Sequence, residues 1–447
     1  MENKRVNGTE KSDIRFSIII PTRERAETLK YAIRTCLYQD FENYEVIVYD
    51  NCSSAETKRV VHSFKSEKIK YFRSDKPLAM SDNWELALSH AVGEYIIFIG
   101  DDDGLLLNSL SKIDRLIREL NVKALCWSTI VYFWPNISLL SANMIKIPWK
   151  RGIRFFRSTD TIPKAANNQL RLTFLPSIYH GVIHRDLVAL LRKKTGRVFS
   201  AGAPDVYASF AFAYILKSYY VLEYPMSITG FSAKSNGISQ YLLQDKESAI
   251  VQEFDTLNIE AGLGWHSKIP NIPIALNLAY PDAFLRAKDA LFPNDINFSI
   301  DRKNLVALWV SALKPNSEEK WKEYMKTIRE SLSDDIDLQK WFDSKFSNYS
   351  PFSQGKNNWL VWFDSKFLRQ YIFSRIKSKL LKVEKKFGGI YELDGRKFSV
   401  KDVFGVAELY DKTNGFELHI ISLKYIHLRL GDIFSTIALS LLRRFRG

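Results

Sequence analysis

At 447 residues, the chain is longer than one ordinary hydrophobic core requires, which predicts two or three domains. Its 46% hydrophobic and 26% charged residues are the proportions of a globular protein and exclude a disordered or wholly membrane-embedded chain. The net charge of +14 favours an anionic partner, which can be a nucleic acid, a phosphate-bearing ligand or an acidic membrane surface.

Three cysteines, Cys36, Cys52 and Cys126, occur without a CxxC motif or another metal-type spacing. Such a scattered, odd set predicts reduced thiols in a cytosolic setting and not a disulfide framework. The first fifteen residues are polar, and no window reaches the roughly 18 uncharged apolar residues of a membrane-spanning helix. We therefore expect a cytoplasmic protein, with a peripheral position on the inner face of the cell membrane as a variant of that location.

The first hundred or so residues alternate between short apolar runs and segments with helical spacing. Strands are predicted at residues 16–21, 44–50, 69–74 and 94–100. Helices are predicted within residues 25–41, after the capping residues Ser53 and Ser54, and from the cap Ser81 to Gly93. This alternation predicts a sheet with parallel strands and helices on both faces, whose ligands bind beyond the carboxyl ends of the strands.

Beyond residue 120 the pattern is weaker. A strand is predicted at residues 124–133, a strand followed by a helix at 179–194, and a helix that begins near Pro204. We divide the chain into a polar tail (1–13), a first domain (14–240) and a mainly helical C-terminal region (241–447), with a loop or hinge at 347–358.

Each of the four early strands is followed by a polar cluster, and the fourth cluster is Asp101–Asp102–Asp103–Gly104. Three adjacent carboxylates repel one another, and a Mg²⁺ or Mn²⁺ ion would remove that repulsion. Such an ion also acts as a Lewis acid on a phosphate leaving group. Taken alone, the same residues fit a solvated turn equally well.

The ends of the first two strands carry side chains that suit a nucleotide. Arg23 and Arg25 can bind phosphates, and Asp50 can accept a hydrogen bond from a nucleobase or a ribose. Asp50 fits an Asx-type turn as well. The absence of a GxGxxG motif after the first strand, and of any GxxxxGK[ST] motif, disfavours dinucleotide-binding and P-loop functions.

The segments SIIIPTRER, TLKYAIRTCLYQDFENYEVIVYDNCSS and GEYIIFIGDDD resemble the family 2 glycosyltransferases of the GT-A fold. The resemblance covers about residues 14–240 and is most specific over 16–110. It implies a Rossmann-like mixed sheet with helices on both faces. It also implies an inverting transfer of a sugar from a nucleotide-diphosphate donor, with Mn²⁺ or Mg²⁺ at a DxD motif. Many members read DxDD, whereas this chain has Gly100 in the first position.

The resemblance also assigns roles to single residues. Donor contacts are expected from Pro21, Thr22, Arg23, Arg25, Asp50, Asp82, Asp101, Asp102 and Lys234. The metal is assigned first to Asp103, with Asp101 beside it, although the triplet leaves the division open. Asp205 is assigned as the general base that takes the proton of the acceptor hydroxyl, while an aspartate after Pro204 is also an ordinary helix cap. Asp82 and its neighbour Asn83 either cap a helix or face the donor sugar.

These observations predict an enzyme of surface-polysaccharide synthesis that glycosylates a hydroxyl of a glycan or a lipid-linked oligosaccharide. Gly100, and the lack of the Glu that commonly precedes the base, leave open a catalytically silent GT-A-fold protein that only binds glycans. Two basic segments, 374–387 and 432–447, fit either an anionic membrane surface or ordinary solvated helices. No nucleic-acid-binding module is visible, so we expect no nucleic acid partner.

Overall fold

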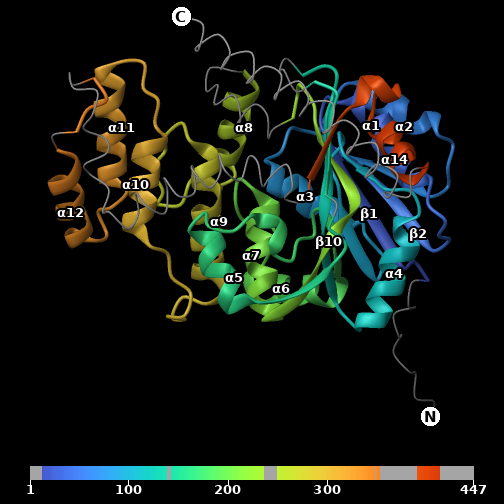
Figure 1. Cartoon of the computed structure of the whole chain (residues 1–447), viewed down its shortest axis with the longest axis horizontal. Coiled ribbons are helices and arrows are strands. Elements are labelled where there is room, and N and C mark those ends of the chain that lie inside the picture. The colour runs from blue at the N-terminus through green and yellow to red at the C-terminus, as the bar shows by residue number, and fades with distance from the viewer. Residues whose placement is uncertain are drawn as a thin grey trace, which may run out of the picture.

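The structure is a computed structural model that describes residues 13–137, 142–148, 150–235, 249–347, 349–352 and 390–412. A twisted sheet with helices on both faces forms one side of the molecule, and a set of helices extends from it to the other side (Figure 1). The mixed sheet and the helical extension are the architecture that the sequence predicted.

The sheet contains both parallel and antiparallel strand pairs. Its strands are β1 (Phe16–Thr22), β2 (Tyr44–Asp50), β3 (Ile69–Arg73), β4 (Tyr95–Phe98), β5 (Gly104–Leu105), β6 (Ala124–Phe133), β7 (Met144–Pro148), β8 (Ile153–Arg157), β9 (Gly181–His184), β10 (Ser218–Phe231) and β11 (Ile390–Asp394). The order is β11-β7-β6-β9-β4-β1-β2-β3, and β10 pairs with β5, β6 and β8. β1 is parallel to β2 and β4, as predicted, whereas β9 is antiparallel to both of its neighbours.

Neighbouring residues of the central strands face two different hydrophobic cores. Ile19 and Ile47 pack on one side, and Ile18 and Val46 pack on the other. The helices of the sheet domain are α1 (Ala26–Leu37), α2 (Ala55–Ser63), α3 (Met80–Ser89), α4 (Ser109–Leu120), α5 (Ser158–Ala166), α6 (Arg185–Thr195) and α7 (Pro204–Leu216). Because a parallel strand is buried on both faces, β1 and β2 are nearly continuous apolar runs.

One predicted helix start is wrong. The helix α3 begins at Met80 with Ala79 as its N-cap, so Ser81 lies inside the first turn. The hydroxyl of Ser81 instead donates a hydrogen bond to the backbone oxygen of Ala201, 2.5 Å away. This bond ties the start of α3 to the segment that leads into α7.

The helical extension shares a core with the sheet domain. Its helices are α8 (Ala249–Glu260), α9 (Ala275–Leu291), α10 (Arg302–Ala312), α11 (Glu318–Glu330) and α12 (Ile336–Phe346). α9 packs on α7 through aromatic pairs, such as Phe210 with Phe284 at 5.7 Å between ring centroids. A single hydrophobic cluster therefore runs from the sheet into these helices.

The last described segment returns to the sheet, which the sequence did not predict. β11 pairs with β7 at one edge, and α14 (Val403–Lys412) packs against α1. The guanidinium of Arg34 on α1 lies 3.8 Å from the ring centroid of Phe404 on α14. Residues 390–412 thus belong structurally with the first domain.

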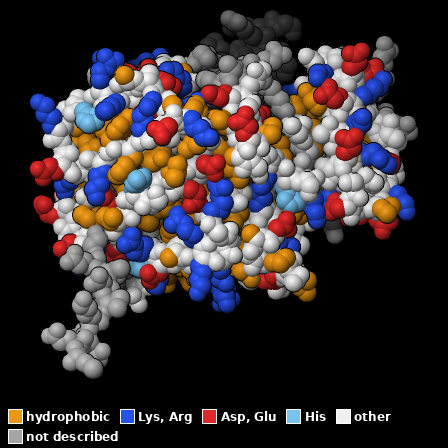
Figure 2. Space-filling view, turned by 180° about the vertical axis from the view of Figure 1, so that it is seen from behind, with side chains coloured by type: hydrophobic (Ala, Val, Ile, Leu, Met, Phe, Trp, Pro, Cys, Tyr) orange, Lys and Arg blue, Asp and Glu red, His pale blue; other side chains and the backbone are white. Residues whose placement is uncertain are grey.

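The predicted boundary near residue 240 and the two basic segments 374–387 and 432–447 lie outside the described residues, as do most of 347–358 and of the polar tail. Within the described part, no helix combines the length and the apolar character needed to cross a membrane. Figure 2 shows one face of the molecule, where basic side chains are interspersed with acidic ones and do not form one basic patch.

Candidate functional site

A cavity of about 580 Å³ lies at the carboxyl ends of the parallel strands, and helices α7, α8 and α9 contribute to its wall. Eight of the residues predicted from the sequence line it: Pro21, Thr22, Arg23, Arg25, Asp101, Asp102, Asp205 and Lys234. Three predicted residues, Asp50, Asp82 and Asp103, are not in its lining. Because parallel strands end at one edge, residues far apart in sequence come together here.

Asp101 is held between the ends of two strands. Its Oδ2 accepts a hydrogen bond from the Thr22 hydroxyl at 2.7 Å, and its Oδ1 pairs with Nη1 of Arg25 at 2.9 Å. Burial would lower the pKa of Arg25, but the carboxylates of Asp101 and Asp102 outweigh burial and raise it above its ordinary value. The guanidinium therefore stays charged and partly neutralises the acidic cluster.

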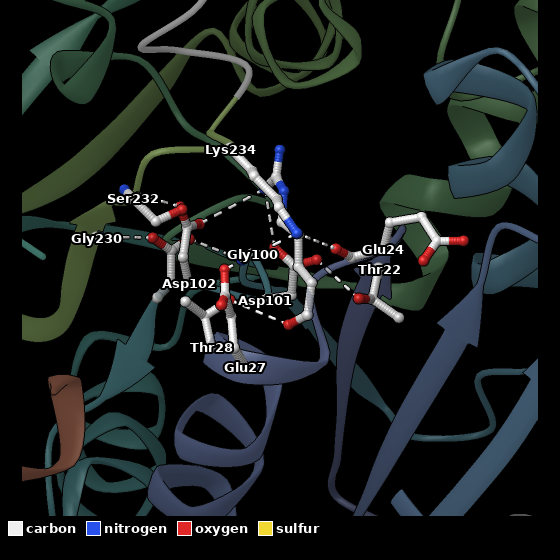
Figure 3. A network of polar contacts seen from close by, with 12 residues as sticks. Thr22, Glu24, Glu27, Thr28, Gly100, Asp101, Asp102, Gly230, Ser232 and Lys234 are labelled. Carbon is white, nitrogen blue, oxygen red and sulfur yellow. Dashed lines mark hydrogen bonds and ion pairs between the residues drawn. The ribbon is translucent and has the colours of Figure 1, made fainter. Parts of the chain in front are cut away.

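Asp102 is the member of the cluster with the least compensation for its charge. Its Oδ2 accepts hydrogen bonds from the hydroxyl and the N–H of Ser232 at 2.7 and 3.3 Å (Figure 3). Its Oδ1 lies 3.9 Å from Nη1 of Arg25. Burial raises the pKa of Asp102 to about 7. The charge of Arg25 lowers this pKa, whereas the neighbouring carboxylates of Asp103 and Asp101 raise it further. A cation in the cavity would hold Asp102 ionised.

Asp103 faces the protein interior and is 1% exposed. Its Oδ2 accepts from the Gly100 N–H at 2.6 Å and from the Tyr179 hydroxyl, and it lies 3.1 Å from Nε2 of His180. Its Oδ1 accepts from the Gly230 N–H at 2.8 Å. Burial would raise the pKa of Asp103, but the contact with His180 and these hydrogen bonds hold it below its ordinary value. A metal contact of Asp103 would have to displace these donors.

Two glycines leave space for the turn that carries the aspartates, one in the turn itself and one on the neighbouring strand β10. A Cβ atom on Gly100 would lie 2.8 Å from Oδ2 of Asp103 and 2.9 Å from the Tyr179 hydroxyl. A Cβ atom on Gly230 of β10 would lie 1.8 Å from the backbone oxygen of Asp102. Gly100 thus leaves space for the hydrogen bond between Tyr179 and Asp103.

Asp50 ends β2 and is fully buried. Its Oδ1 accepts from the Ser53 N–H at 2.8 Å, and its Oδ2 accepts from the Tyr71 hydroxyl at 2.6 Å. The bond to Ser53 is the turn that the sequence offered as one of two interpretations. Its neighbour Asn51 lines the cavity, whereas Asp50 does not. The nucleobase contact of Asp50 therefore stays a prediction.

The first turn of α3 separates the two residues that the sequence could not distinguish. Asp82 pairs with Nη2 of Arg197 at 2.6 Å, on the side of α6 and α7. Asn83 lines the cavity and is 3% exposed. Helical periodicity places both residues at a helix start, but it does not say which of the two faces a ligand.

Asp205 is in the first turn of α7, partly exposed at the cavity wall. The N-cap of α7 is Ala203, and no side chain caps this helix. Burial raises the pKa of Asp205 to about 6. The backbone N–H groups of Asp205 and Val206, together with His180, lower this pKa but do not offset the effect of burial. The cavity therefore has a carboxylate of raised basicity in a wall that the aspartate triplet does not form.

The two remaining cations of the cavity also have partners, and Lys234 lies 4.0 Å from the carboxylate of Glu27. Arg23 forms an ion pair with Glu253 of α8, and Nζ of Lys234 donates to the backbone oxygen of Glu24 at 3.2 Å. Figure 3 shows Lys234 in the same network of polar contacts as Asp101 and Asp102. Glu253, like Tyr280 of α9, lines the cavity but was missed, because it lies beyond the segment that resembles a known family.

The fold is an α/β sheet, and the site is an acidic cluster at the carboxyl ends of its parallel strands. Residues 17–170 match the family model Glycosyl transferase family 2. The predicted family resemblance is therefore confirmed over this segment, and the mixed sheet is that of the GT-A fold that it implied.

Two curated relatives match parts of this chain. A GalNAc(5)-diNAcBac-PP-undecaprenol β-1,3-glucosyltransferase of Campylobacter jejuni is 37% identical over 108 residues, which cover 24% of this chain and 35% of the relative. A UDP-Glc:α-D-GlcNAc-diphosphoundecaprenol β-1,3-glucosyltransferase of Escherichia coli is 26% identical over 133 residues, which cover 30% and 49%. The matches span less than half of each relative's length.

The crystal structure of residues 1–349 of TarS of S. aureus in complex with UDP-GlcNAc superposes with a TM-score of 0.45 and 14% identity. It covers 74% of this chain and 84% of that one.

Proposed function

We propose that this chain is a metal-dependent, inverting glycosyltransferase. It moves a sugar from a nucleotide-diphosphate donor to a hydroxyl of a glycan or lipid-linked acceptor. The observation that carries the proposal is the composition of one cavity. It combines an acidic cluster and cations that suit a metal-bound diphosphate with a separate carboxylate, Asp205, whose pKa of about 6 suits a general base. The names of the two curated relatives refer to undecaprenol-linked diphosphates, which supports the class of acceptor.

The donor's diphosphate is assigned to the side of the cavity with Arg25, Lys234 and the first two aspartates. Among the described residues, no group of three or more histidine, cysteine or acidic side chains is arranged to hold a metal. A Mg²⁺ or Mn²⁺ ion at phosphates often needs only one or two protein carboxylates, because the substrate supplies further oxygens. Asp102 fits that requirement, because its carboxylate lines the cavity and its pKa is raised by burial and by the neighbouring carboxylates of Asp103 and Asp101.

We therefore assign the metal to Asp102, with Asp101 beside it and Asp103 as the anchor of the turn. When bound, the ion neutralises the charge that develops on the diphosphate leaving group. Arg25 orients Asp101 and adds a fixed positive charge. Lys234 is assigned to bind the phosphates through an N–H donor.

The transfer itself needs one base. Asp205 accepts the proton of the acceptor hydroxyl as its oxygen attacks the anomeric carbon from the side opposite the diphosphate. The bond from the anomeric carbon to the phosphate oxygen breaks, and its electron pair leaves with the diphosphate. A single displacement of this kind inverts the anomeric centre. With a pKa of about 6, Asp205 is mostly ionised at neutral pH and still basic enough to accept a proton.

The test is turnover of a panel of nucleotide sugars by the purified chain, with and without Mn²⁺ and an undecaprenyl-diphosphate-linked sugar as acceptor. We expect metal-dependent release of nucleoside diphosphate with at least one donor and a product of inverted configuration. Turnover that is unchanged by EDTA would refute the metal role, and a retained configuration would refute the single displacement.

The second candidate function is the silent glycan-binding protein, which Gly100 suggested. The glycine has a structural role in this chain, because it leaves space for the bond between Tyr179 and Asp103. It is therefore weak support for a loss of catalysis. Binding of a donor without any release of nucleoside diphosphate would favour this second function.

A further inference from the structure

The side chain of Asn83 has an unusual position for an amide. It lines the cavity and is 3% exposed. Its Oδ1 is buried and has no hydrogen-bond partner among the residues that the structure describes. Nearly all buried polar side-chain atoms in proteins are hydrogen-bonded, because an unpaired one destabilises the folded state.

No structural role of Asn83 explains this arrangement. The N-cap of α3 is Ala79, and no side chain caps the helix. The backbone N–H of Asn83 makes the ordinary helical bond to the oxygen of Ala79 at 3.0 Å. The amide therefore contributes neither a cap nor an internal hydrogen bond, although its residue lines the cavity.

Asn83 connects the two sides of the site that are assigned to the diphosphate and the base. The bond from Ser81 to the oxygen of Ala201 holds the start of α3 against the segment that leads to Asp205. On the other side, the ring of Trp84 packs on that of Tyr179 at 5.5 Å, and the hydroxyl of Tyr179 donates to Asp103. On the proposed function, the sugar to be transferred would lie between the diphosphate and the base, in the cavity that Asn83 lines.

We infer that the side-chain amide of Asn83 binds a neutral hydroxyl or acetamido group of the transferred sugar and thereby sets the donor preference. The inference rests on the proposed function. An amide can both donate and accept a hydrogen bond, which suits either group.

The test compares wild type, Asn83→Ala and Asn83→Asp. Leu86→Ala is the matched control, because Leu86 is on the same helix and is 42% exposed. For each protein, kcat and KM are measured with pairs of donors that differ in one substituent, such as UDP-glucose with UDP-galactose and with UDP-N-acetylglucosamine. The affinity for UDP alone and the Tm are measured in parallel.

We expect Asn83→Ala to lower kcat/KM for the preferred donor by about tenfold, the size of one hydrogen bond, and to reduce the preference within a pair. The affinity for UDP stays the same, and the Tm does not fall, because an unpaired buried group has been removed. Asn83→Asp, which keeps the shape of the side chain and adds a charge, weakens the binding of sugar donors relative to the binding of UDP. Leu86→Ala behaves as wild type.

Unchanged preferences in Asn83→Ala overturn the inference and leave the proposed function intact. An equal loss for all donors together with a lower Tm also overturns it, because that result identifies a structural residue. If the wild-type protein turns over no nucleotide sugar, the proposed function fails, and the inference fails with it.

Discussion

Asp205 is a carboxylate that the fold holds at the cavity wall with little compensation for its charge. Burial raises its pKa from 3.8 to about 6, a difference of 6 − 3.8, or about 2.2 pH units. Each unit corresponds to about 1.36 kcal/mol, so ionised Asp205 destabilises the folded state by at most about 3 kcal/mol. Because the side chain is partly exposed to cavity water, we expect about 1–2 kcal/mol.

The variant Asp205→Asn removes this charge and keeps the shape of the side chain. We expect it to be more stable than wild type at pH 7, with a Tm higher by about 1–2 °C. Its turnover falls by about 10²–10⁴-fold, because the general base is lost. One substitution thus raises stability and removes activity.

The pH dependence has a definite sign. The folded-state pKa of Asp205 is above the unfolded one, so folding favours the protonated form. Wild type and Asp205→Asn are therefore equally stable below about pH 4, and wild type loses relative stability as the pH rises from about 4 to 6. Above that range the difference stays constant, while kcat/KM of wild type falls as the pH drops below about 6.

Thermal unfolding and donor turnover of both proteins, measured from pH 4 to pH 8, test this reasoning. Asp186→Asn is a suitable control, because Asp186 is in the first turn of α6 and its pKa is lowered by a hydrogen bond from Lys123. This control should not raise the Tm at pH 7. A lower Tm of Asp205→Asn at pH 7, or turnover within a few-fold of wild type, would refute the role of Asp205.

Three further substitutions test other parts of the site. Asp102→Asn should abolish the stimulation of donor turnover by Mn²⁺ while UDP still binds without metal, and metal titrations of both proteins check this. Gly100→Ala should lower the free energy of unfolding by about 1–3 kcal/mol, because the new methyl group overlaps Oδ2 of Asp103; denaturant unfolding measures the loss. Glu253→Gln should release Arg23 for the diphosphate and lower the donor KM about two- to fivefold, the range of an exposed ion pair; an unchanged KM would show that the pair does not compete with the donor.

Local sequence periodicity correctly predicted individual strands of the sheet. β1 and β2 are apolar on both faces, and β6 is a ten-residue strand at the predicted position. The pairing of distant strands could not be predicted in this way. The placement of β9 between β4 and β6, and the pairing of β11 with β7, depend on contacts between segments far apart in sequence.

The same distinction applies to the site. The rule that ligands bind at strand ends correctly grouped Thr22, Arg25 and Asp101 around one cavity. It could not separate Asp102 from Asp103, because the direction of each carboxylate is set by donors on other strands, such as Gly230 of β10. The cavity walls from α8 and α9 lie beyond any motif and were not predicted.

The return of β11 and α14 to the sheet makes the helical extension an insertion and not a trailing arm. The chain leaves the sheet after β10 and pairs with it again at β11, so α8 to α12 lie in sequence between two strands of the same sheet. A truncation after β10 would remove the α8 and α9 walls of the cavity together with the β11 edge and the α14 cover of α1. An internal deletion between β10 and β11 would remove the helices and keep β11 and α14. Such a deletion can therefore separate the contribution of the helices to acceptor and donor binding from the contribution of β11 and α14 to the stability of the sheet.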